Sequence, residues 1–191
     1  MGLPPIPPFE GLHPLIVHFP IGILLIAWIP MVVGLIVKSQ RHAWMASAAM
    51  LLVVGTIGAF VTVLTGEAAE DIVGETSRAV GDAIHEHEET AELARNLFLG
   101  VTILFLAAWG VAAKIRPARR TTAASIGAVL VAVAYGVASV VLMNAGHQGG
   151  VLVHTHGIQA PLGSADPGAP AAGDRDHEHD EDEEDEEDDD G

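Results

Sequence analysis

Four long apolar runs constrain what this chain can fold into. They cover about residues 15–37, 43–65, 96–115 and 121–143, and each is roughly as long as the 20 residues that cross a bilayer as an α-helix. A helix of this length in a water-soluble protein would show a charged face, whereas three of the four runs contain no charged residue. The sequence therefore predicts an all-α integral membrane protein built as a four-helix bundle.

The charge of the chain is concentrated at its C-terminus. The formal net charge is −16, and residues 161–191 hold 15 acidic residues against one basic residue, Arg175. This segment has no apolar periodicity, which is typical of disorder, so we expect a transmembrane domain at residues 1–160 and a disordered acidic tail after it. A chain this acidic is not expected to bind nucleic acid. The absence of cysteine excludes thiolate metal sites and iron–sulfur clusters.

The basic residues of the short loops predict an orientation. Lys38 and Arg41 lie between the first two runs, and four more basic residues lie between positions 114 and 120. The positive-inside rule places both loops in the cytoplasm. We therefore expect a multi-pass protein of the plasma membrane, with the N-terminus, the loop at residues 66–95 and the C-terminus outside.

Three prolines predict irregularities in the first helix. Pro14 suits the first helical position, and Pro20 lies early in the helix, where the loss of one backbone donor is expected to matter little. Pro30 lies in the middle of the span and is expected to kink or loosen the helix there, because it removes a backbone hydrogen bond.

Seven of the ten histidines belong to segments that this topology brings to the outer membrane face. His13 and His18 stand at the start of the first run, and the others precede the third run or follow the fourth. On the helix that leads into the third run, His87 shares one face with two alanines and Phe98, at i, i+4, i+7 and i+11. The seven are His13, His18, His85, His87, His147, His154 and His156.

Small residues at helical spacing predict close approach of neighbouring helices. One stripe lies in the second run and another in the fourth, so we expect both stripes to face the interior of the bundle. The first consists of Gly55, Ala59, Thr62 and Gly66, and the second of Ala128, Ala132, Gly136 and Ser139.

Four motifs resemble those of a family of predicted four-span membrane proteins, catalogued as domain of unknown function 2231. The motifs are "LHPLIVHFPIG", "TGEAAED", "HEETAEL" and "GGVLVHTHGI", and together they cover residues 12 to about 158. The resemblance implies a four-helix membrane domain, sometimes found beside cytochrome-like or other redox modules, and no established activity. The matching positions are His13, Pro14, His18, Phe19, Pro20, Thr65, Gly66, His87, Glu88, Gly149, Gly150, Leu152, Val153 and Gly157.

Two kinds of cofactor site are compatible with the histidines. Ligation of a haem b by two imidazoles needs neutral histidines on facing helices, and His18 and His87 are the best pair, with His147 as a substitute. A zinc, copper or non-haem iron site would add carboxylates to the imidazoles. Its candidate ligands are His13, His18, His85, His87, His147, His154, His156, Glu67, Glu70 and Glu88.

Two functions from different classes therefore stay open. One is a small membrane subunit that binds haem or metal and transfers electrons; the other is a non-catalytic structural or assembly component of a membrane complex, in which the histidines only hydrogen-bond backbone carbonyls. The sequence contains no GxSxG, P-loop or GxGxxG motif, which weakens the interpretation as a hydrolase or transferase. The expected partners are the lipid bilayer and either redox membrane proteins or further copies of the chain.

Overall fold

The computed structural model describes residues 7–70, 77–114 and 117–158, and these residues contain helices and no strand. The all-α class predicted from the sequence is confirmed. The acidic tail predicted at residues 161–191 lies outside the described residues. The elements are η1 (Phe9–Gly11), α1 (His13–Ile16), α2 (His18–Ile26), α3 (Trp28–Ile36), η2 (Lys38–Gln40), α4 (Arg41–Glu70), α5 (Arg78–Lys114) and α6 (Pro117–His154).

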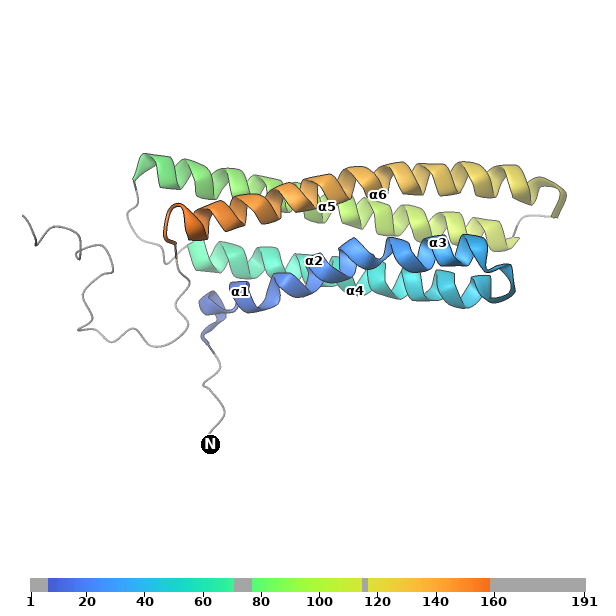
Figure 1. The fold of residues 1–191 in the computed structure, drawn as a ribbon, viewed down its shortest axis with the longest axis horizontal. Coiled ribbons are helices and arrows are strands. Elements are labelled where there is room, and N and C mark those ends of the chain that lie inside the picture. Colours follow the sequence, from blue (N-terminus) through green and yellow to red (C-terminus); the bar gives the residue numbers. More distant parts are fainter. Residues whose placement is uncertain (1–6, 71–76, 115–116, 159–191) are drawn as a thin grey trace, which may run out of the picture.

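The helices form two antiparallel hairpins that lie side by side (Figure 1). Hairpin one consists of α1 to α4, and hairpin two of α5 and α6. We call the end that holds the start of α1 and the end of α6 the histidine end, and the opposite end, with η2, the end of α5 and the start of α6, the basic end. Within the part of the chain that the structure describes, four helical stretches are long and apolar enough to cross a membrane, namely His13–Ile36, Lys38–Glu70, Arg78–Ala112 and Ser125–His154.

The outer surface of the helices suits contact with lipid. Large apolar side chains are exposed along the spans, among them Ile36 at 72%, Val140 at 68% and Val133 at 63% of their surface. A water-soluble protein would cover a contiguous apolar surface of this kind. The chain is therefore an integral membrane protein whose outward face contacts the bilayer.

Proline divides the first span into three helical pieces. α1 ends at Ile16 and α2 ends at Ile26, four residues before Pro20 and Pro30 respectively. A proline ring lacks the N–H that would bond to the carbonyl of residue i−4, and it also collides with that carbonyl. The irregularity expected at Pro30 is thus present, and Pro20 interrupts the helical hydrogen bonds as well, although little effect was expected there.

Two glycines of α4 allow the broken helix to pack closely. A Cβ atom at Gly55 would lie 2.7 Å from Cγ of Leu24, and one at Gly58 would lie 3.0 Å from Cβ of Pro20. The side chains of α2 therefore occupy the space that any larger residue would need at these positions.

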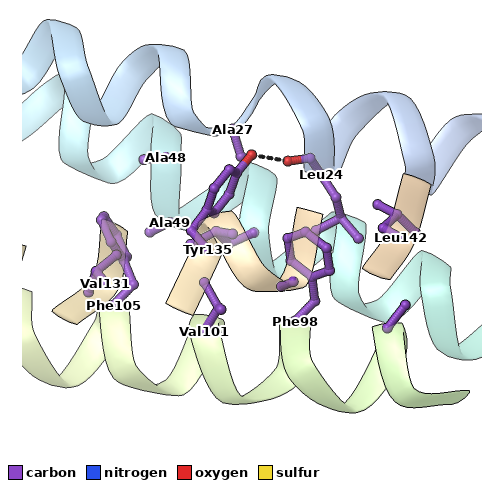
Figure 2. Close-up of a cluster of buried hydrophobic side chains, with 13 residues drawn as sticks. Leu24, Ala27, Ala48, Ala49, Phe98, Val101, Phe105, Val131, Tyr135 and Leu142 are labelled. Carbon is purple, nitrogen blue, oxygen red and sulfur yellow. Dashed lines mark hydrogen bonds between the residues drawn. The ribbon is translucent and has the colours of Figure 1, made fainter. Parts of the chain in front are cut away.

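The core joins the two hairpins around Tyr135 (Figure 2). The Tyr135 hydroxyl donates a hydrogen bond to the Leu24 carbonyl, three residues before the break at Ala27. The Tyr135 ring also meets Phe98 edge-to-face, with 5.7 Å between the ring centroids. The polar tip of the single tyrosine thus satisfies a carbonyl of the interrupted helix, while its ring packs in the core.

The fully buried face of α6 lies beside the predicted small-residue stripe. Val131, Tyr135, Ala138 and Leu142 are buried, whereas Ala128, Ala132 and Gly136 of the stripe line an open cavity between the helices at the basic end, to which Ala132 and Gly136 are exposed. The reason is that α6 is apolar on all sides, so its pattern does not distinguish the face that meets protein from the face that meets lipid.

A hydrogen bond between Thr56 and Thr102 ties α4 to α5 within the core, with 2.8 Å between the two hydroxyl oxygens. We expect Thr56→Val to lower the free energy of unfolding by about 0.6–2 kcal/mol, since the partner hydroxyl loses its bond in an apolar setting. Reversible unfolding in mixed detergent micelles measures the change. Adding Thr102→Val should cost little more than the first substitution; two additive losses would contradict the coupling.

Candidate functional site

A cavity of about 570 Å³ opens between the hairpins at the histidine end. It exists because α2 packs mainly against α4, and α6 mainly against α5, so α2 and α6 meet only sparsely. Its lining runs from Glu70 to Ala59 on α4 and from Ile84 to Phe98 on α5. Eleven residues of helix correspond to roughly 16 Å, so the cavity extends deep into the bundle.

His13 enters the cavity from hairpin one. Its Nδ1 lies 3.0 Å from the carbonyl oxygen of Thr62 on α4. A carbonyl can only accept, so Nδ1 carries the proton and Nε2 is the unprotonated nitrogen of the neutral ring. The ring also lies against Gly66, where a Cβ atom would come within 3.2 Å of Nδ1 and Cε1.

His87 enters the same cavity from hairpin two. Its Nδ1 is buried and makes no well-formed hydrogen bond within the described residues, although the Ala145 carbonyl on α6 is near enough to interact with the imidazole. The ring lies against Gly149, where a Cβ atom would come within 3.1 Å of Cε1. His13 and His87 are also close enough to influence each other electrostatically.

The two hairpins therefore present equivalent surfaces to the cavity. In each, a histidine of the first helix approaches the carbonyl of Thr62 or Ala145, which lies four residues before the glycine that the ring contacts. The lining of the first helices repeats with the same offsets of 4, 7 and 11 residues. These positions are His13, Val17, Pro20 and Leu24 in hairpin one, and His87, Ala91, Ala94 and Phe98 in hairpin two.

Charged side chains also line this cavity. Glu67, Glu70 and Glu88 contribute three carboxylates, and Arg95 contributes a guanidinium. The Arg95 guanidinium bonds to Glu92 at 3.0 Å and lies 5.1 Å from the centroid of the Phe60 ring. With the imidazoles neutral, the lining is therefore net negative.

Ile158 completes the lining after the end of α6. Gly157 adopts a φ of +68°, a left-handed conformation that favours glycine and ends a helix. The N–H of Ile158 then donates to the Leu152 carbonyl at 3.1 Å, which turns the chain back onto the bundle.

The structure brings together half of the ten site residues proposed from the sequence. Those that line the cavity are His13, His87, Glu67, Glu70 and Glu88. The others do not line it: His18, His85, His147 and His154 are exposed, and His156 is partly buried.

His18 does not pair with His87, and this part of the expectation is corrected. His18 follows His13 by five residues, about 140° around the helix, and is therefore exposed on the other side; its Nδ1 lies 3.1 Å from the Pro14 carbonyl. His147, the expected substitute, is exposed on α6. His13 takes the place of His18, and its spacing to Val17, Pro20 and Leu24 was the signal that could have identified it.

The described parts of the chain hold no group of three or more His, Asp or Glu side chains arranged to bind a metal ion. His85 instead pairs with Glu89 at 3.3 Å on the exposed face of α5. The carboxylate-supplemented metal site considered from the sequence is thus not assembled here.

Comparison with known proteins agrees with this architecture. The sequence model of the predicted membrane protein family DUF2231 matches residues 10–161, which include every described helix except the first residue of η1. The chain belongs to the DUF2231 family. The match ends close to the end of α6, so the cavity and both of its histidines lie inside the DUF2231 domain. No curated protein and no solved structure matches the chain.

Proposed function

We propose that this DUF2231 protein is a small membrane electron-transfer subunit that holds a haem b between His13 and His87. The observation that carries the proposal is the pair of imidazoles, one from each hairpin, that face a single cavity. In His13 the Thr62 carbonyl orients the ring and leaves Nε2 free; a histidine that binds a metal through one ring nitrogen usually donates from the other to such a carbonyl.

The local fit favours haem over a non-haem metal. Haem iron takes at most two axial ligands from protein, whereas mononuclear zinc or copper sites take three or more. Gly66 and Gly149 leave space for the two imidazole rings that a larger residue would fill. The buried Nδ1 of His87 lacks a well-formed hydrogen bond, and ligation of iron by Nε2 would help to orient the ring toward the Ala145 carbonyl.

A bound haem b would supply a one-electron couple. The chain itself would hold the rings in a fixed tautomer and exclude water with the apolar lining contributed by residues such as Leu24, Phe98 and Leu142. The three carboxylates would stabilise ferric haem relative to ferrous haem and would therefore lower the reduction potential of the haem. Redox membrane proteins are the partners that this function implies.

The test is an absorption titration of the detergent-purified, full-length protein with hemin. We expect a Soret band and reduced-state bands of the bis-imidazole, low-spin type. His13→Ala and His87→Ala should each abolish this spectrum while leaving expression and helicity nearly unchanged.

Two exposed histidines provide matched controls. His18→Ala removes the contact to the Pro14 carbonyl and His85→Ala the ion pair with Glu89, and neither side chain lines the cavity, so both variants should keep the native spectrum. Failure of the native chain to bind hemin would contradict the proposal. It would favour the structural alternative, in which His13 serves only to join α1 to α4 through the Thr62 carbonyl.

We further propose that the histidine end faces outward and the basic end faces the cytoplasm, on the evidence of Lys38, Arg41 and the basic residues at 114–120. The cysteine-free sequence allows a direct test with a membrane-impermeant maleimide. Ser77→Cys, at the histidine end, should react in intact cells. Ser39→Cys, at the basic end, should react only after lysis, and the reverse pattern would invert the orientation.

A further inference from the structure

A second cavity lies at the basic end, and nothing in the proposed function uses it. Its volume is about 950 Å³, and it opens between α3, α4, α5 and α6. Like the first cavity, it exists because the first span packs on α4 and makes few contacts with α6. We propose that this basic-end cavity is a binding site for an anionic phospholipid.

The positive charge of the cavity lining favours an anionic ligand. Lys38, Arg41 and His42 line the cavity, and the described lining contains no Asp or Glu. This is the opposite of the histidine-end cavity, which carries three carboxylates. Basic pockets between transmembrane helices are the usual receptors of anionic lipid headgroups.

Arg41 is held in position at the rim of the cavity. Its Nε donates to the Gly34 carbonyl at 3.1 Å, and its Nη2 donates to the Leu35 carbonyl at 3.5 Å. These bonds fix the guanidinium against the last turn of α3 and use two of its five N–H donors. A phosphate at the rim would therefore meet a preoriented cation.

The depth of the cavity matches one leaflet of a bilayer. The lining reaches from Lys38 to Trp28 on the first span, and ten residues of helix correspond to roughly 15 Å. The hydrocarbon core of a bilayer is about 30 Å thick, so a chain with its headgroup at Lys38 would end near the midplane.

The wall below the cations is apolar and suits an acyl chain. It is formed by residues such as Met31, Val32, Phe105 and Val131. Trp109 lies at the boundary, with its ring centroid 5.3 Å from that of His42 and 6.4 Å from that of Phe105. An aromatic side chain between a polar and an apolar zone is typical of the membrane interface.

Native mass spectrometry of the delipidated, full-length protein tests the proposal. The probes are phosphatidylglycerol and phosphatidylcholine with identical acyl chains. We expect phosphatidylglycerol to bind at least fivefold more tightly, because a single basic residue near the surface contributes roughly that factor.

Two pairs of variants locate the site. Lys38→Gln should lower the preference for phosphatidylglycerol by roughly fivefold, the contribution of one basic residue, whereas Arg78→Gln makes the same charge change at the histidine end and should leave the preference intact. Gly136→Leu fills the cavity from α6 and should weaken both lipids. Gly100→Leu places the same side chain on α5, in open space outside either cavity lining, and should weaken neither.

Equal binding of the two lipids by the native chain would overturn the proposal. An unchanged preference in Lys38→Gln or unchanged binding in Gly136→Leu would also overturn it. A lipid-free dimer that occludes the cavity would instead assign the surface to a second copy of the chain. These readouts do not involve hemin, so they succeed or fail independently of the electron-transfer proposal.

Discussion

Phe98→Ala is expected to lower the free energy of unfolding by about 3–5 kcal/mol. Phe98 is completely buried and is the largest such side chain in the described core. Within a bilayer most of this loss comes from van der Waals contacts, because lipid is as apolar as the protein interior, so we expect the lower end of the range. The edge-to-face contact with Tyr135 is lost as well (Figure 2). Unfolding in mixed detergent micelles, followed by circular dichroism, measures the change.

The neighbouring residue supplies a matched control for Phe98. Leu99 is 38% exposed and lies toward the lipid-facing side of α5, so Leu99→Ala should cost less than about 1 kcal/mol. Phe98→Leu should recover part of the stability lost in Phe98→Ala. Equal effects at positions 98 and 99 would show that α5 does not bury the face described here.

Gly55→Ala is expected to have the second largest effect on stability, a loss of about 1–3 kcal/mol. The added methyl carbon would lie 2.7 Å from both Cγ and Cδ2 of Leu24, which is itself fully buried. Neither atom can withdraw without moving α2 away from α4. The same unfolding measurement reports the loss.

Gly100→Ala adds the same methyl group to α5, where nothing lies within 4 Å of the new atom. This substitution should be neutral or slightly stabilising, since alanine loses less backbone entropy in a helix than glycine. If Gly55→Ala proved as harmless as Gly100→Ala, the close approach of α2 to α4 would be wrong.

The histidine-end cavity shows where sequence patterns were sufficient. The face formed by His87, Ala91, Ala94 and Phe98 was predicted from helical spacing, and all four residues line the cavity. A polar residue followed by small ones is informative on a helix, because the polar group must find partners while the small residues let another helix approach. The small-residue stripe predicted on α4 also lines this cavity, through Ala59, Thr62 and Gly66, for the same reason.

His18 was expected at the cavity because it lies about one turn inside the first span, but depth along a helix does not determine which face a residue occupies. His18 follows His13 by five residues, about 140° around a helix, and Val17 between them keeps a helical φ of −55° and ψ of −37°, so His18 is exposed while His13 lines the cavity. The hydrogen bond missing at Pro20 does not change the rotation per residue, because the spacing of His13, Val17, Pro20 and Leu24 continues through it. The expectation that His147 could substitute as a ligand failed differently, since α6 continues as a helix to His154 and its rotation there leaves His147 exposed.

The sequence by itself determined that the chain is a four-span helical membrane protein, because length and the absence of charge leave a segment no other stable conformation in a bilayer. It could not determine which face of α6 is buried or which histidines meet. Within a bilayer, lipid can solvate every face of an apolar helix, so only contacts with neighbouring helices determine which face is buried. Tertiary structure alone therefore decided that Tyr135 joins the hairpins, that His13 and His87 share a cavity, and that a second, basic cavity opens at the opposite end.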